Sequence, residues 1–283
     1  MQPRIAQKIA GILVLFTSIP NLQSQPPGAQ TFSAASIRLS KSADARGRGF
    51  KFLPGGKVSA TNIPIYRVIA EAWNLAILNE SARLSGGPDW LRSDGYDIEA
   101  TPEPGVVASR DQARLMLQHL LADRFRLTIR PQTKELPFYA VTVPKSGPKL
   151  QKANIDPKDC LEGAPVNGIT CHQIGGGMGR GVHGQAIDLG DLAGFVENWS
   201  DRPVIDKTVL TGLFAIETDG WTPMRPRPVR DPSLPPSAED LAMADPARPT
   251  LFMIFDKLGL KLEPRKGPVE TFVIEHVERP TEN

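Results

Sequence analysis

Four histidines, two cysteines and one run of glycines are the residues of this sequence that could most readily do chemistry. The histidines are His119, His172, His183 and His276, and no two of them are four residues apart. The zinc-binding pair of a helical face is therefore missing, as is any His-Glu-x-x-His motif. The sequence also has no Gly-x-Ser-x-Gly nucleophile motif. We therefore predict no catalytic, metal-binding or cofactor-binding residues, and a protein that is not an enzyme.

The glycine-rich stretch 175–181 (Gly-Gly-Gly-Met-Gly-Arg-Gly) has the composition of a phosphate-binding loop. It lacks the Gly-Lys-Ser/Thr ending that brings an ammonium group to bound phosphates and a hydroxyl to magnesium. It also leads into a predicted strand and not directly into a helix, so no helix dipole would face an anion there. Since glycine allows positive φ angles, we interpret the stretch as a hairpin turn.

Two groups of acidic residues have structural explanations. Asp97 and Glu99 flank Ile98 on a predicted strand, so both should point away from the face that buries Ile98, toward water. With Asp94 they cluster at one turn and strand, without the separation across a cleft that glycosidic chemistry requires. Residues 206–208 (Asp-Lys-Thr) are predicted to form a turn whose side chains bind nearby backbone N–H groups. The alternative for that turn is a loop that recognises a ligand.

The N-terminus has the pattern of a secretory signal peptide. Arg4 and Lys8 precede a short apolar run, Ile9–Phe16, which is followed by a proline and small or polar residues. We predict a signal peptide over residues 1–24 and a flexible tail over 25–31. The apolar run is too short to span a bilayer comfortably, although an uncleaved N-terminal anchor is the alternative. We therefore expect an exported protein, periplasmic or extracellular, with no stable transmembrane span after cleavage.

Cys160 and Cys171 are the two cysteines of the chain. In an exported protein an even number of cysteines favours a disulfide. A metal site at this point would need more ligands than the neighbouring His172 supplies. We therefore predict a Cys160–Cys171 disulfide.

The charge balance bears on possible partners. The chain has 33 lysines and arginines against 31 acidic residues, and Arg4 and Lys8 are lost with the predicted signal peptide. The remaining positive and negative charges are equal in number and interspersed. The sequence therefore lacks the basic footprint that nucleic-acid binding requires.

A pattern of elements in the first half of the chain recurs in the second. The order strand, helix, strand, helix and two final strands predicts an α+β fold of two tandem related modules, 32–143 and 175–283. Each module would be a small sheet with two helices on one face. A linker over 144–174 would join them and hold both cysteines. An insertion over 221–249 contains eight prolines and few aliphatic residues, so we expect a disordered or extended surface segment.

Each copy should contain two helices followed by a two-stranded hairpin. In the first copy these elements are helices 65–75 and 109–123 and strands 125–129 and 136–143. A turn over 131–135 would join the two strands, and Ser109 with Gln112 would cap the second helix. In the second copy they are helix 188–199, a helix that Gly259 ends, and strands 260–263 and 269–276.

Two tryptophans lie beside predicted turns. Trp90 follows Gly86-Gly87-Pro88-Asp89, and Trp221 precedes Thr222-Pro223. Their rings either wedge the turns onto the module core or form exposed anchors for a partner. Trp90 and Trp221 are therefore our candidates for a binding surface.

Several motifs together resemble one known family. Residues 32–38 (Phe-Ser-Ala-Ala-Ser-Ile-Arg) resemble the opening Phe-x-Val-Ala-Ser-Ile-Lys of a large, mainly acidobacterial family of uncharacterised exported proteins from soil bacteria. The most distinctive block of that family is similar to residues 85–91 (Ser-Gly-Gly-Pro-Asp-Trp-Leu) and 96–100. Further similar blocks lie at 115–118, 120–125, 203–208, 258–263, 266–270 and 277–283. One departure is the stretch 211–216, Thr-Gly-Leu-Phe-Ala-Ile, which lacks the Tyr-Asp pair that usually follows in the family.

The resemblance implies a role in the cell envelope, without catalytic residues to carry over. Similar domains occur appended to membrane metallopeptidases of the beta-lactam-sensor type, which implies sensing or partner binding outside the cytoplasm. The module pattern also looks like the short N-terminal domain of secretins and TonB-dependent receptors, a protein-interaction module. We expect a non-catalytic module that binds an envelope protein or peptide, through sheet edges and the proline-rich insertion. The alternative is an envelope hydrolase whose site forms between the two modules, using His183 or His276 with an acidic residue.

Overall fold

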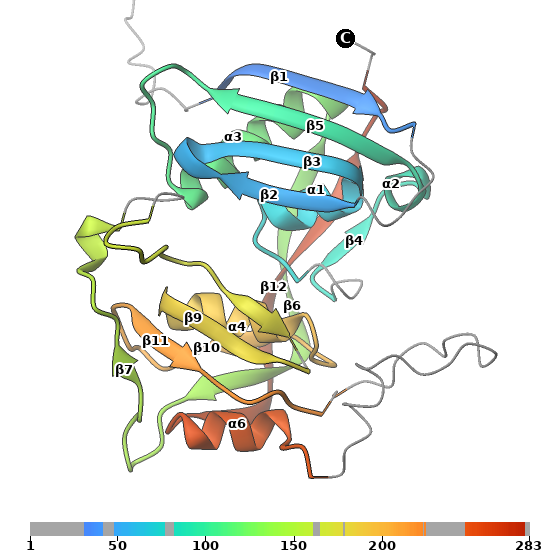
Figure 1. The fold of residues 1–283 in the computed structure, drawn as a ribbon. Helices are drawn as coiled ribbons and strands as arrows, with labels where there is room; N and C mark the ends of the chain where they lie inside the picture. Colours follow the sequence, from blue (N-terminus) through green and yellow to red (C-terminus); the bar gives the residue numbers. More distant parts are fainter. Residues whose placement is uncertain are drawn as a thin grey trace, which may run out of the picture.

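The part of the chain that the structure describes has a mixed α/β fold with three four-stranded sheets (Figure 1). The computed structural model describes residues 31–41, 48–76, 82–160, 165–177, 179–222, 224 and 247–280. The predicted signal peptide (1–24), nearly all of the predicted tail (25–31) and most of the proline-rich insertion (221–249) lie outside the described residues. We call the chain up to residue 142 the first half and the chain from residue 151 the second half.

The first sheet is antiparallel and has the strand order β1-β5-β3-β2. Its strands are β1 (Phe32–Leu39), β2 (Gly49–Leu53), β3 (Lys57–Pro64) and β5 (Gly95–Pro102). Helices α1 (Ile65–Ala72) and α3 (Arg110–Phe125) pack on one face, as Figure 1 shows. Alternate residues of the strands and one stripe of each helix are apolar, so they share one core with residues such as Val58, Ile69, Ile98 and Leu121.

A second antiparallel sheet has the order β7-β11-β9-β8. Its strands are β7 (Gln151–Lys152), β8 (Gly175–Gly177), β9 (Gly181–Ile187) and β11 (Phe214–Glu217). Helices α4 (Leu189–Glu197) and α6 (Leu251–Lys257) contribute to its core, with residues such as Val182, Leu192, Phe214 and Ile254. When the strands of each half are taken in chain order, both sheets have the same order and pairing sense. The edge strand β7 lies inside the stretch predicted as a linker, 144–174.

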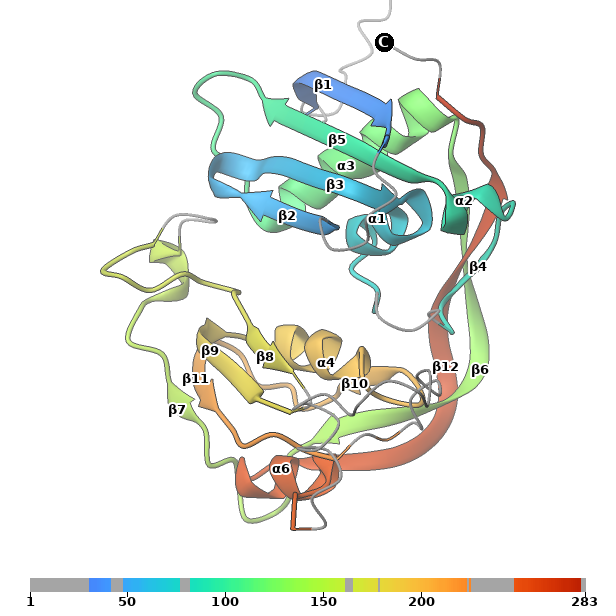
Figure 2. The ribbon, with the colours of Figure 1, turned by 45° about the vertical axis from the view of Figure 1, so that its right-hand side comes forward.

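The third sheet joins the two halves and has the order β10-β6-β12-β4. Its long central strands, β6 (Thr128–Thr142) and β12 (Lys261–His276), are antiparallel and run along one side of the molecule from one half to the other (Figure 2). Each short edge strand of this sheet pairs with the long strand of the other half. β10 (Val204–Asp206) of the second half pairs in parallel with β6, and β4 (Leu84–Gly86) of the first half pairs in parallel with β12.

The hairpins predicted at the end of each half are wrong. Residues 131–135 continue the single strand β6, and 261–263 with 269–276 belong to the single strand β12. The prolines in these strands are Pro131, Pro137, Pro264 and Pro268, and all four fall on the same alternate set of β6–β12 pairs. At that set the backbone N–H points away from the partner strand. The N–H of Tyr139, for example, donates to the Pro203 oxygen at 2.8 Å, on the β10 side. Proline therefore removes no β6–β12 hydrogen bond.

Local signals in the sequence are confirmed at several helix ends. Ser109 and Gln112 form the predicted capping box at the start of α3. Gly259 has φ +68° directly after α6, the conformation in which glycine ends a helix. The remaining short elements are α2 (Trp90–Ser93) and two 3₁₀ turns, Pro54–Gly56 and Pro157–Asp159. No helix of the described part is long and apolar enough to cross a membrane.

Candidate functional site

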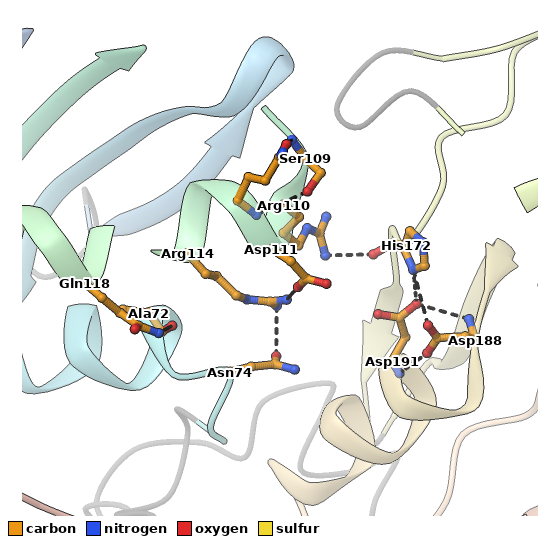
Figure 3. Close-up of polar contacts among 11 residues, drawn as sticks. Ala72, Asn74, Ser109, Arg110, Asp111, Arg114, Gln118, His172, Asp188 and Asp191 are labelled. Carbon is orange, nitrogen blue, oxygen red and sulfur yellow. Dashed lines mark hydrogen bonds and ion pairs between the residues drawn. The ribbon is translucent and has the colours of Figure 1, made fainter. Parts of the chain in front are cut away.

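A cluster of charged and polar side chains lies where α3 of the first half faces α4 of the second (Figure 3). We call it the interface cluster, and its members are Arg110, Arg114, His172, Asp188 and Asp191. A cavity of about 190 Å³ adjoins it and is lined from both halves. The lining residues are Glu71, Asn74, Leu75, Arg110, Arg114, His172, Ile174, Gly190, Asp191, Gly194, Phe195 and Asn198.

His172 is held at this point by its neighbours in the chain. The preceding residue forms the predicted disulfide, Cys160–Cys171, whose Cα atoms are 5.9 Å apart. The backbone N–H of His172 donates to the Ala186 oxygen at 2.8 Å, which ties the segment to the end of β9. The side-chain Nδ1 lies 2.6 Å from Asp191 Oδ2, and we assign the proton to this nitrogen because a carboxylate can only accept.

Two aspartates at the start of α4 face this imidazole. They form a capping box, in which Asp188 Oδ1 accepts from the Asp191 N–H at 2.7 Å and Asp191 Oδ2 accepts from the Asp188 N–H at 3.1 Å. Asp188 Oδ2 lies 3.7 Å from His172 Nδ1. Burial, and then the negative charge of Asp191, raise the pKa of Asp188 above its usual value. Burial and the charge of Asp191 therefore both disfavour the ionised form of Asp188.

The first half contributes two arginines to the cluster. Arg110 Nη1 donates to the backbone oxygen of His172 at 2.7 Å, a direct hydrogen bond between the halves. Arg114 donates to Asn74 and to Asp111, each at 2.8 Å, and so fixes the start of α3 against the end of α1 (Figure 3). Arg110 therefore links the halves, whereas Arg114 organises the surface on its own side.

A second ionic contact lies beside a further cavity of about 460 Å³ between the halves. Arg83 Nε lies 3.3 Å from Glu197 Oε1, and Glu197 is only 6% exposed. The other oxygen of Glu197 accepts from the Val204 N–H at 3.0 Å, at the start of β10. Burial raises the pKa of Glu197, although the nearby Arg83 opposes that shift. This carboxylate therefore ties α4 to both the segment before β4 and the central sheet.

A large hollow lies over the second sheet, on the side of its outward residues. We call it the outer hollow. Its volume is about 620 Å³, and it gathers side-chain amides, a hydroxyl and one histidine–carboxylate pair. The lining residues are Gln151, Lys152, Asn154, Ile169, Thr170, Gln173, Gly175, His183, Gly184, Gln185, Ala215, Ile216 and Glu217. His183 Nδ1 lies 2.5 Å from Glu217 Oε1, but the side chains are 42% and 77% exposed. Such an open pair lacks the water exclusion that strengthens catalytic electrostatics.

The two tryptophans predicted as candidates for a binding surface differ in burial. Trp221 is 0% exposed and packs edge-on against Trp199, with ring centroids 5.9 Å apart, so its assignment to a surface is wrong. A large ring gains more by filling the second core than by remaining in water. Trp90 is partly buried against the first core, and the Arg279 guanidinium lies 5.0 Å from its ring centroid. An anchoring role for Trp90 stays a prediction.

The other residues considered in the sequence have the structural roles that were predicted for them. The glycine stretch forms the β8–β9 hairpin, in which Gly177 pairs with Gly181. Asp206 Oδ1 accepts from the Thr208 N–H at 2.8 Å, as predicted for a turn. Glu99 is exposed on its strand. His119 and His276 are exposed as well, and neither belongs to the interface cluster.

The sequence did not reveal the association of His172 with Asp188 and Asp191. The spacing of these three residues in the sequence matches no metal-binding or catalytic motif. They come together in space because β9 brings the chain back to the segment that follows the disulfide. The one usable signal was the acid three residues after Asp188, which predicts a capping box and thus the start of α4.

The fold and these sites define an α/β protein with an internal disulfide, whose two halves share a central sheet and meet at a polar interface. The chain belongs to the family described as protein of unknown function (DUF3738), whose model matches residues 66–277. No curated protein and no solved structure matches the chain.

Proposed function

We propose that this protein is an exported, non-catalytic cell-envelope module that binds a peptide or a segment of another protein. The observation that carries the proposal is the outer hollow, which combines an accessible sheet face with a neighbouring edge strand, β8. Export is supported by the Cys160–Cys171 disulfide, because disulfides persist mainly outside the reducing cytosol. The shared strand order of the two outer sheets supports an origin as two tandem related modules. The similarity to secretin and TonB-receptor N-terminal domains is a proposal at fold level only.

The chemistry of the outer hollow suits an extended peptide. Gln151, Asn154, Gln173 and Gln185 carry amides that both donate and accept, as the backbone of a peptide requires. Strand β8 consists of Gly175–Gly177, so it carries no side chains of its own along that edge. Arg180 Nη2 donates to the Gly176 oxygen at 2.9 Å in an exposed hydrogen bond, which a pairing peptide strand would replace. Main-chain hydrogen bonds would supply affinity, and the hollow would select side chains.

The test is selection of binding peptides from a random library on the purified, disulfide-intact protein. The affinity of selected peptides is then measured by fluorescence anisotropy for wild type and two variants. Ala215→Arg places a long charged side chain in the outer hollow. Thr101→Arg makes the matched change at an exposed position of β5, the corresponding strand of the first sheet. We expect affinity to fall about tenfold or more in Ala215→Arg only, equivalent to about 1.4 kcal/mol. Equal affinities in all three proteins would refute the site.

A second candidate function is an envelope hydrolase with its site between the halves. The observation in its favour is the His172–Asp191 pair beside the cavity of about 190 Å³. An aspartate that orients an imidazole is the arrangement of a general base. The test is hydrolysis of chromogenic ester, amide and phosphate-ester substrates. Turnover that disappears in His172→Ala, and persists in His183→Ala, would favour this function over the binding module.

A further inference from the structure

We propose that His172, Asp188 and Asp191 bind a divalent transition-metal ion, with Zn²⁺ as the best match. One imidazole nitrogen and two carboxylate oxygens from these residues all lie within 4.8 Å of one another. They come from two segments, the residue after the disulfide and the first turn of α4. This site is separate from the outer hollow and does not depend on the proposed function.

The spacing of the donor atoms suits one ion. His172 Nδ1 lies 2.6 Å from Asp191 Oδ2 and 3.7 Å from Asp188 Oδ2. Ligands about 2.0–2.2 Å from a tetrahedral zinc are about 3.2–3.6 Å apart, between these two values. On metal binding the neutral imidazole would carry its proton on Nε2 and not on Nδ1, so that the Nδ1 lone pair is free for the metal. The carboxylates need only small rotations, because each side chain is already aimed at the imidazole (Figure 3).

The surroundings agree with a bound cation. Asp188 and Asp191 place two carboxylates against one imidazole at the start of α4. A divalent ion would offset the negative charge of both carboxylates. The capping box fixes Asp188 and Asp191 at the start of α4, and the disulfide fixes the segment of His172. The three ligands are therefore largely pre-organised. Arg110 Nη1 donates to the backbone oxygen of His172 and so helps to hold the residue that supplies the imidazole ligand.

The donor set also indicates which class of metal fits. Mg²⁺ and Ca²⁺ prefer oxygen ligands alone, whereas a mixed imidazole and carboxylate set suits Zn²⁺ or a similar transition metal. Three protein ligands leave at least one coordination position for water or a ligand group. The adjoining cavity of about 190 Å³ gives that position room, between α4 and the arginines of α3.

The test is a zinc titration of the whole mature protein, with its disulfide intact, after removal of metal by a chelator. Zn²⁺ is added in competition with a chromophoric chelator, and the melting temperature is measured with and without Zn²⁺ and Mg²⁺. We expect one Zn²⁺ per chain, a higher melting temperature with Zn²⁺, and no such effect of equimolar Mg²⁺.

Three variants locate the ion. His172→Ala and Asp188→Asn each remove one ligand, and asparagine keeps the N-cap hydrogen bond, so Asp188→Asn should fold. His183→Ala is the matched control, because it removes the other histidine–carboxylate pair of the same half. We expect affinity to fall about tenfold or more in the first two and to be unchanged in the control. No stoichiometric zinc in wild type, or affinity that Asp188→Asn leaves unchanged, would overturn the proposal.

Discussion

Removal of the Cys160–Cys171 disulfide should destabilise the protein by a calculable amount. The cysteines are 11 residues apart in sequence, and closing a loop of that length lowers the entropy of the unfolded chain. The chain-entropy relation gives about 2.8 kcal/mol at 25 °C for this loop. For a chain of this size each kcal/mol corresponds to about 2–4 °C, so the melting temperature should fall by about 6–11 °C. The variant to use is Cys160→Ser with Cys171→Ala, because Cys171 is only 4% exposed and packs against Ala186 and Leu213.

The assay is urea unfolding followed by circular dichroism, for the oxidised wild type, the reduced wild type and the double variant. Reduced wild type and double variant should agree, since both lack the same cross-link. Hydrogen exchange adds a local readout. His172 follows the disulfide and binds Arg110 across the interface, so amides near His172 should exchange faster in both. A loss of stability below about 0.5 kcal/mol would show that the unfolded loop is already restricted, and the entropy argument would fail.

Three further results are expected. Glu197→Ala should lower the free energy of unfolding by about 3–5 kcal/mol, because it removes a buried carboxylate that faces the Arg83 guanidinium and accepts from the Val204 N–H, and Glu197→Gln should cost less in the same urea assay. For Asp188, an acid whose pKa is raised by folding, stabilisation is complete below its unfolded pKa and is lost as pH rises through the folded pKa. Metal-free Asp188→Asn should therefore gain stability relative to wild type between pH 3 and pH 7; a constant difference across that range would contradict the burial argument. Gly181→Ala and Gly105→Ala have similar φ angles, +87° and +84°, and each should cost about 1–2 kcal/mol for the left-handed backbone. Of these two positions, only Gly181 would bring the new Cβ against a backbone oxygen. The Gly181→Ala variant should therefore lose about 1–3 kcal/mol more stability than Gly105→Ala, as measured by thermal melting.

Local structure could be predicted from the sequence because its causes are local. The apolar stripe of α3, the capping box at Ser109 and the glycine after α6 each act within a few residues. The disulfide was predicted from the even number of cysteines together with the predicted export signal, and it is confirmed. The repeat predicted the order of elements, and the two outer sheets have the same strand order.

The central sheet could not be predicted, because its cause is not local. Pro131 suggested a turn, and only the pairing with β12 makes a continuous strand the better solution. The partner strand is distant in sequence, and no local pattern specifies the register. The exchange of β4 and β10 between the halves likewise depends on how the halves stack.

The interface cluster was hidden for a related reason. His172, Asp188 and Asp191 meet through a disulfide, a hairpin and a helix start, and each of these was predictable alone. Their combination in space was not, because the fold and not the spacing sets the distances between them. The contact of Arg110 with His172 requires in addition the packing of one half on the other.

The central sheet also sets the order in which the chain can fold. During synthesis β6 is complete at residue 142, whereas its partner β12 begins only at residue 261. Until then the edge of β6 that faces β12 has no partner strand, although β10 can already pair with part of the other edge, and unpaired strand edges are a hazard for aggregation. Pairing of such distant segments has a high entropic cost before any contact forms, so folding should be slow. A chain exported N-terminus first, as we propose for this protein, would therefore need protection until its last strand has crossed the membrane, and neither half should fold stably when expressed alone.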